Sequence, residues 1–242
     1  MFLATHQAGF GAGAGSVGPL VLVGAPTLEL RAENNNGTAW TNLGSLGATG
    51  DFSGTSSAGA ADSNFNGQFS ARFTAGSSNT MTSGALLSQI ITNSAMTGLI
   101  VARWATVNGD APPITSANGA ALFTDAGGFV TTGTATDFHF ESFDGAGDEI
   151  STAVSANATY GLQFQHAGGE LTLLRSGASA ATPVTSGNVS DLTNTLQIGR
   201  QGASTKYFDG WIALIAIWNT ALSSTDLETN RNNTATFFGF TW

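Results

Sequence analysis

An apolar segment near the C-terminal end of the chain shows no alternation of apolar and polar residues. It covers residues 211–218, WIALIAIW, and contains no charged, amide or hydroxyl side chain. A short run that is apolar throughout is typical of a strand covered on both faces. Strict alternation would give each face one set of side chains: Ile212, Leu214, Ala216 and Trp218 on one, Trp211, Ala213, Ile215 and Ile217 on the other. We therefore predict that this segment is the central strand of a two-layer β-sandwich.

Shorter apolar or alternating segments predict further strands along the rest of the chain. Turn residues separate these segments at intervals of about 8–12 positions, which is typical of all-β sandwiches. Residues 86–91 predict either a strand or a single helical turn. The predicted strands are residues 20–23, 27–31, 68–73, 98–105, 120–123, 129–132, 137–143, 149–154, 160–166, 170–175, 196–199 and 208–218.

One helix and one long loop complete the predicted elements. Ser223 followed by Asp226 has the spacing of a capping box, which predicts a short C-terminal helix through about residue 231. Residues 40–64 are rich in Gly, Ser, Thr and Ala, which predicts a surface loop held by a few apolar anchors: Trp40, Leu43, Leu46 and Phe52. The chain is predicted to comprise a Gly-rich arm, residues 1–18, and a single domain, residues 19–242.

Motifs at both ends of the predicted domain resemble one family. The C-terminal motif consists, in order, of Ile198-Gly199, a loop, Phe208-x-Gly210-x-Ile212, an apolar strand ending in Trp218-Asn219, and Ala221-Leu222-Ser223. It resembles the end of concanavalin A-like jelly rolls of the laminin-G type. The N-terminal motif is similar to the opening of bacterial and phage members and consists of Trp40, Leu43, Asn66-Gly67 and Arg72-Phe73.

The resemblance covers roughly residues 26–238 and implies the fold. It implies an all-β, two-sheet antiparallel jelly-roll sandwich with one short C-terminal helix. Many relatives carry acidic residues in the last strand where this chain has Ala213 and Leu214, so no role of those acids is transferred. Because one fold supports many functions, the function has to be argued from the site.

Composition narrows the classes of partner. Only 10% of the 242 residues are charged, the formal net charge is −9, and Lys206 is the one lysine. Such a chain is unsuited to nucleic acid or anionic membranes, which attract basic surfaces. The absence of cysteine excludes disulfides, thiolate metal sites and cysteine catalysis. The N-terminus does not resemble a signal peptide, and no stretch approaches the ~20 apolar residues of a membrane-spanning helix.

Residues with catalytic potential do not form a recognised pattern. Glucanases of concanavalin A-like fold carry a Glu-x-Asp-x-Glu strand, and this spacing is absent from the chain. His6, His139 and His166 lie far apart and do not have zinc-ligand spacing, and His139 is interpreted as a half-exposed strand residue. We therefore predict that the protein is not an enzyme.

Two kinds of binding site remain as candidates. Asp144 and Asp148 lie in a Gly-rich segment that is interpreted either as a solvated turn or as a Ca²⁺ site; no other metal or cofactor is predicted. Most tryptophans are needed for the core, but Trp40, in the predicted loop, and Trp242, at the terminus, are candidates for exposed platforms that stack on sugar rings.

The N-terminal arm predicts an assembly role. Residues 1–18 contain five glycines and three large apolar side chains, Phe2, Leu3 and Phe10. Burial of so little apolar surface does not offset the conformational entropy that the arm loses when it is ordered, roughly 1–2 kcal/mol per residue. Docking of Phe2, Leu3 and Phe10 on a neighbouring subunit is one interpretation, and folding back along the arm's own domain as an edge strand is the other.

These observations predict a non-enzymatic structural or adhesion protein of the virion surface, a bacteriophage capsid decoration or fibre component. Its predicted partners are other virion proteins, further copies of itself and a host surface glycan, without nucleic acid or membrane insertion. The alternative is a carbohydrate-binding module of a bacterial extracellular protein. The predicted location is accordingly the virion surface or, otherwise, the extracellular space.

Overall fold

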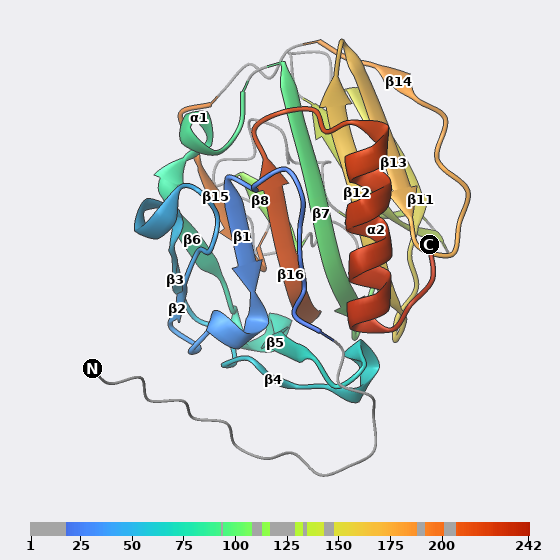
Figure 1. Cartoon of the computed structure of the whole chain (residues 1–242). Helices are drawn as coiled ribbons and strands as arrows, with labels where there is room; N and C mark the ends of the chain where they lie inside the picture. Colours follow the sequence, from blue (N-terminus) through green and yellow to red (C-terminus); the bar gives the residue numbers. More distant parts are fainter. Residues whose placement is uncertain are drawn as a thin grey trace.

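The computed structural model describes residues 18–92, 94–107, 113–116, 129–132, 135–142, 148–187, 192–200 and 207–242. In this part of the chain the strands pair antiparallel and form two layers, with one long helix on the outside (Figure 1). None of the helices in these ranges has the length and apolarity needed to cross a bilayer. The predicted fold class, an all-β antiparallel sandwich with a C-terminal helix, is confirmed.

The first layer is an eight-stranded sheet. Its order is β14 (Val184–Thr185), β13 (Glu170–Arg175), β12 (Thr159–Ala167), β7 (Ala95–Trp104), β16 (Gly210–Trp218), β5 (Phe69–Phe73) and β4 (Ala60–Ala61). The remaining strand, β1 (Leu28–Arg31), pairs with the second half of β16, whereas β5 pairs with its first half. Strand β16 therefore lies at the centre of the sheet, as predicted.

The second layer contains a five-stranded and a three-stranded sheet. The five-stranded sheet has the order β2 (Ala39–Trp40), β3 (Phe52–Gly54), β6 (Met81–Leu86), β15 (Thr195–Ile198) and β8 (Ile114–Ser116). The three-stranded sheet has the order β11 (Asp148–Ala153), β10 (Ala135–Ser142) and β9 (Phe129–Thr132). A single helical turn, α1 (Leu87–Ile90), follows β6, which decides between the two interpretations of residues 86–91.

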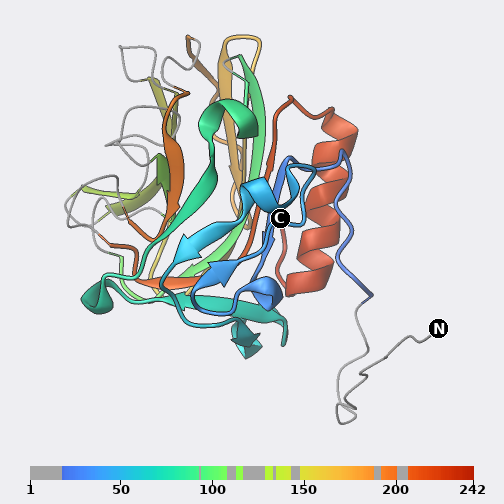
Figure 2. The same cartoon turned by 90° about the vertical axis from the view of Figure 1, so that its left-hand side faces the viewer.

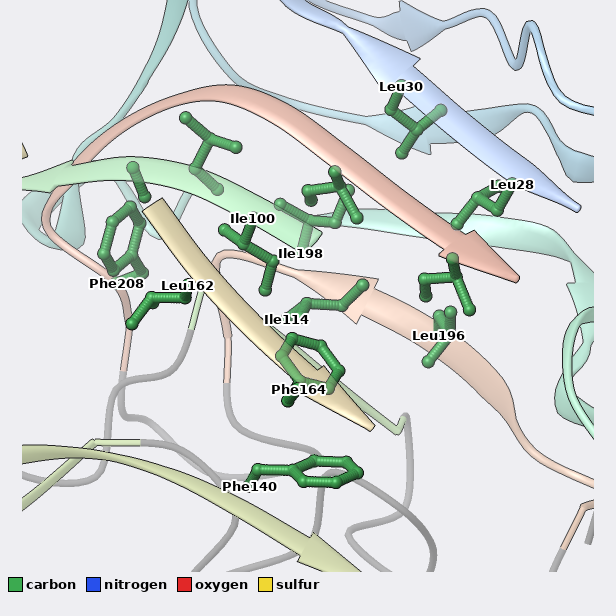
Figure 3. Packing of buried hydrophobic residues seen from close by; sticks show 14 of the residues in the cluster. Leu28, Leu30, Ile100, Ile114, Phe140, Leu162, Phe164, Leu196, Ile198 and Phe208 are labelled. Carbon is green, nitrogen blue, oxygen red and sulfur yellow. The ribbon is translucent and has the colours of Figure 1, made fainter. Parts of the chain in front are cut away.

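The main core lies between the two layers. Figure 3 shows how side chains of the large sheet, such as Ile100 and Phe164, face Leu196, Ile198 and Phe140 from the second layer. All five side chains are at most 1% exposed. Burial of such aliphatic and aromatic side chains contributes roughly 1.5–3 kcal/mol each, so this interface is the main stabilising element of the domain.

A β-bulge in β16 changes which residues share a face. The pairing with β7 shifts between Ile212 and Leu214, so one extra residue, Ala213, enters the strand. Ile212 consequently joins Ile215 and Ile217 in the main core. The prediction of strict alternation from residue 211 to 218 is therefore wrong, because the bulge inverts the parity after residue 212. The predicted burial of this strand is otherwise confirmed from Ile212 onwards, and Trp211 is half-buried.

Helix α2 (Ser224–Phe238) covers the outer face of the large sheet, as Figures 1 and 2 show. The Ser223 Oγ accepts a hydrogen bond of 3.2 Å from the Asp226 amide, which confirms the predicted N-cap. The helix ends at Gly239, whose φ of 75° favours glycine, and is thus longer than predicted. A second core between α2 and the sheet contains Leu99, Leu214, Ala216, Trp218 and Phe238.

Several local predictions are corrected by the structure. Residues 20–23 do not form a strand; they run beside α2, where the Asn230 side chain hydrogen-bonds both the amide and the carbonyl of Val23. The predicted loop at residues 40–64 contains strands β3 and β4 and two 3₁₀ turns, because its backbone pairs with β2, β6 and β5. Strand β8 and all of β6 except residue 86 lie outside the segments predicted as strands. The predicted strand at residues 120–123 lies outside the described residues.

Candidate functional site

An open groove lies at the β5 and β4 edge of the large sheet. It has a volume of about 460 Å³ and is lined by residues of the 57–64 segment together with Ser70, Arg72 and Trp211. Ser70, Arg72 and Trp211 project from the outer face of the sheet, the face that α2 covers elsewhere. We call this feature the Trp211 groove.

Hydrogen bonds fix the wall of the groove around Asp62. One carboxylate oxygen of Asp62 accepts hydrogen bonds from the Asn64 amide (2.9 Å) and the Asn64 side chain (2.7 Å). The other oxygen accepts one from the Ser70 hydroxyl (3.0 Å). Phe65, fully buried, anchors the same turn against Phe238 of α2 with ring centroids 6.4 Å apart. The wall is therefore held by both the sheet and the helix.

The floor of the groove ends on a tryptophan between two arginines. Trp211 of β16 pairs directly with Arg72 of β5 on one side and with Arg103 of β7 on the other. The guanidinium carbons lie 4.4 Å (Arg72) and 4.7 Å (Arg103) from the centre of the indole ring. Both distances are within the range of cation–π attraction. Stacking occupies the face of a guanidinium group and leaves its N–H donors, which lie in the plane, available for other partners.

Arg72 is held by several partners within the protein. It forms an ion pair with Asp209 at 2.5 Å and donates to the carbonyl oxygens of Phe73 and Gly210. Burial alone would raise the pKa of Asp209, but hydrogen bonds from Arg72 and Thr106 and the charge of Arg72 lower it below its usual value. Arg72 and Asp209 are therefore a fixed, mutually neutralised pair beside the groove.

Arg103 has fewer partners than Arg72. Among the described residues it makes one hydrogen bond, from Nη2 to the exposed Asn157 side chain at 3.2 Å, and no ion pair. Its Nε is buried without a hydrogen-bond partner there. Arg103 is half-buried, and among the described residues no carboxylate neutralises its charge next to Trp211.

This arrangement suits a polar ligand with an apolar surface. An aromatic ring offers apolar contact area, and the surrounding guanidinium, carboxylate and hydroxyl groups can exchange hydrogen bonds in fixed directions. Sugars combine vicinal hydroxyls with an apolar ring surface, and an open groove admits one residue of a longer chain.

A second groove, of about 350 Å³, lies between α2 and strands β12 and β13. Its walls are mainly apolar, and the side chains of Gln163, Gln165 and Arg231 already bond one another or the backbone. Arg231 donates to Gln163 at 2.6 Å, and Gln163 and Gln165 donate to the carbonyls of Leu227 and Leu222. The Trp211 groove is therefore the better candidate for a polar ligand.

The structure corrects one of the two predicted sugar platforms. Trp40 is fully buried, and its ring stacks on that of Phe73 with the ring centroids 6.3 Å apart. Its Nε1 donates a hydrogen bond of 2.7 Å to the Arg31 carbonyl. The pairing of β2 with β3 directs its ring into the core, so it has no face for a sugar. Trp242 is half-buried over Gly161, and its Nε1 donates to the Arg231 carbonyl at 2.7 Å. Its role in sugar binding stays a prediction.

Other predicted sites fall in undescribed parts of the chain. The assembly residues Phe2, Leu3 and Phe10 lie outside the described residues, as does Asp144. The backbone of Asp148 begins β11, and nothing is described of its side chain. Within the described ranges no three metal-ligating side chains come together. The assembly role and the Ca²⁺ site stay predictions.

The histidines do not form a catalytic cluster in the described residues. His139 is 7% exposed, which corrects the prediction of a half-exposed residue; the pairing of β10 with β11 brings it to 3.1 Å from Glu149. His166 is 1% exposed, and its burial lowers its pKa. His6 lies outside the described residues.

Comparison with known proteins shows the fold. The sequence matches no protein-family model, and no curated protein resembles it significantly. Domain 4 of AbnA, a GH43 extracellular arabinanase from Geobacillus stearothermophilus solved with arabinotriose, is similar with a TM-score of 0.63 and 12% identity over 85% of this chain and 98% of that domain. The binding domain of Paraclostridial Mosquitocidal Protein 1 gives 0.62 and 9% over 86% of this chain.

A third structure is the binding domain of botulinum neurotoxin DC in complex with SialylT. It has a TM-score of 0.57 and 13% identity over 87% of this chain. The chain spans about half of each toxin chain, 52% in both. These neighbours are binding domains or domains of extracellular proteins. Their likeness to this chain shows the fold, and the laminin-G and phage resemblance stays a prediction.

Proposed function

We propose that this chain is a carbohydrate-binding module of an extracellular protein and that the Trp211 groove receives the sugar. The observation that carries the proposal is the half-buried Trp211, set between two guanidinium groups at the floor of a polar groove. The fold supports it, because solved domains of similar fold have been obtained with an arabinose oligomer and with SialylT. We propose binding without catalysis.

Different residues at the groove can bind different parts of a sugar. Trp211 supplies apolar contact area for a sugar ring. Ser70 and Asp62 supply a hydroxyl and a carboxylate on the wall, and Asp62 can accept a further hydrogen bond from a sugar hydroxyl because a carboxylate offers about four lone pairs. Arg103 does not line the groove itself, but it contacts Trp211 from the side of β7 and can supply donors there to a ligand that reaches over the indole ring. The hydrogen bonds within the wall keep these groups in place before the ligand arrives, which reduces the entropy lost on binding.

The test is calorimetric titration with a panel of neutral and acidic oligosaccharides, comparing the unmodified chain with Trp211→Ala. Loss of a central aromatic contact costs more than about 1 kcal/mol, so the affinity is expected to fall at least about fivefold. Phe69→Ala is the matched control. Phe69 is 41% exposed on β5, but it shares the face of the core residues Ala71 and Phe73 and so lies on the side of the sheet opposite the groove. This variant is expected to bind normally.

Trp242→Ala distinguishes the two candidate platforms. If Trp242→Ala abolishes binding while Trp211→Ala binds normally, the sugar site lies at the C-terminus of the chain and the proposed groove is wrong. If no oligosaccharide of the panel binds the unmodified chain, the proposed function is wrong. Melting curves of each variant establish that the domain is folded.

A further inference from the structure

We infer that the Trp211 groove selects a carboxylated sugar, a uronic or a nonulosonic acid, with the carboxylate bound by Arg103. The inference rests on the proposed function and adds the class of ligand. It follows from the different states of the two arginines that flank Trp211.

Arg72 is unsuited to bind an external anion. Its charge is neutralised by Asp209 at 2.5 Å, and its Nη1 donates to two backbone carbonyls. An incoming carboxylate would meet the Asp209 carboxylate beside the same guanidinium group. Like charges at such a distance disfavour binding, so Arg72 acts as part of the scaffold.

Arg103 has the opposite properties. Among the described residues no carboxylate pairs with it, and its one hydrogen bond goes to the neutral side chain of Asn157. The guanidinium carbon of Arg103 lies 4.7 Å from the centre of the Trp211 ring, and this contact limits the rotamers of the side chain before binding. A guanidinium group held by its face presents its N–H edge, and this edge matches the two oxygens of a carboxylate.

The remaining charges of the groove orient the ligand. Asp62 is the acid that lines the groove, and it would repel a carboxylate but accept hydrogen bonds from hydroxyls. A carboxylated sugar satisfies both requirements when its carboxylate points to β7 and its hydroxyls point to the 57–64 wall. The formal net charge of −9 makes unspecific attraction of anions unfavourable, so selectivity has to come from local contacts such as this one.

The inference is tested with pairs of ligands that differ in the carboxylate. One pair is oligogalacturonate and the corresponding galactose oligomer, and the other is sialyllactose and lactose. A charge-assisted bidentate contact makes the acidic member of at least one pair bind about tenfold more tightly or better. The pair that shows the preference identifies the source of the carboxylate, uronic or nonulosonic.

Arg103→Gln is expected to abolish this preference, because it weakens binding of the acidic member about tenfold more than binding of the neutral member. Arg175→Gln is the matched control. The guanidinium carbon of Arg175 also lies over an aromatic ring, 4.8 Å from the centre of Tyr160, and within the described ranges Arg175 likewise has a buried Nε without a partner and no ion pair. It differs in its parity, which it shares with the core residues Leu171 and Leu173 on the opposite face of the sheet. This variant is expected to retain the preference.

The outcomes separate this inference from the proposed function. If the neutral members bind as tightly as the acidic ones and Trp211→Ala weakens both, the groove is a sugar site and the inference of a carboxylate is wrong. If the preference survives Arg103→Gln, another group binds the carboxylate and the assignment to Arg103 is wrong. If neither pair binds, the inference is wrong, and the proposed function fails with it only if no other oligosaccharide of the panel binds the unmodified chain.

Discussion

Replacement of Gly98 by alanine tests the packing of the two layers. Gly98 lies in β7 directly opposite Phe164 of β12. A methyl group at residue 98 would come within 2.1 Å of two ring carbons of Phe164, whereas non-bonded carbons prefer about 3.5–4.0 Å. The ring has little room to move, because it is 1% exposed and its centre lies 4.7 Å from that of Phe140 and 5.9 Å from that of Phe138 (Figure 3).

The expected cost follows from this overlap. Overpacking of a tight core destabilises by about 1–3 kcal/mol. For a domain of this size each 1 kcal/mol lowers the melting temperature by about 2–4 °C, so Gly98→Ala is expected to lower it by roughly 2–12 °C. Gly76→Ala is the matched control, because Gly76 is exposed and a methyl group there would meet no atom within 4 Å. Urea unfolding gives the free energy of unfolding of both variants, and thermal unfolding gives their melting temperatures.

A double variant identifies the clash as the cause. In the background of Phe164→Leu the ring carbons that the new methyl group would meet are absent. Gly98→Ala is then expected to cost at least about 1 kcal/mol less than in the unmodified chain, a coupling within the range seen for residues in contact. The reasoning is refuted if the two changes are additive, or if Gly98→Ala destabilises no more than Gly76→Ala.

Two further changes test the central strand and the ion pair beside the groove. Ile215→Asp is expected to unfold the domain, because Ile215 is fully buried and an unpaired buried charge costs several kcal/mol of a free energy of unfolding of about 5–15 kcal/mol. The control Ile215→Val should remain folded. A native circular dichroism spectrum with unchanged melting for the aspartate variant would contradict the assignment of the central strand. Asp209 stabilises the fold at pH values above its unfolded-state pKa of about 3.9, and this contribution is lost as the pH falls through its lower folded-state pKa. The acid-induced loss of stability, measured by urea unfolding between pH 7 and pH 3, should therefore be smaller for Asp209→Asn; equal losses would show that the pair with Arg72 does not contribute.

The central strand could be predicted because its physical cause is local. Eight consecutive apolar residues have no polar face to present to water, whatever the rest of the chain does. The bulge at Ala213 could not be predicted in the same way, because it depends on the hydrogen-bond register with β7 and leaves the pattern of side-chain polarity unchanged. The burial of Trp40 was missed because the surrounding Gly, Ser and Thr residues indicate a loop, whereas long-range pairing with β6 brings the segment into the second layer.

The central residue of the candidate site, Trp211, belongs to the same strand, β16. Trp211 belongs to the apolar run and was interpreted as core, yet it is half-buried because α2 does not cover that end of the outer face. Two arginines inside predicted strands were the available signal, since Arg72 in residues 68–73 and Arg103 in residues 98–105 both need partners. Arg72 and Arg103 contact the same indole ring, and this contact depends on the register of three strands that are distant in sequence.

The bulge in β16 has a consequence for how the sequence of this domain can diversify. Before the bulge, Trp211 faces the groove; after it, Leu214, Ala216 and Trp218 face α2 on the same side of the sheet. Trp211 still packs against the edge of the second core, so the side chains around it can be exchanged with less effect on the helix interface than Trp211 itself. A library that randomises Ser57, Ser63 and Ser70 and keeps Trp211 would therefore sample new ligand specificities while the core under α2 stays unchanged.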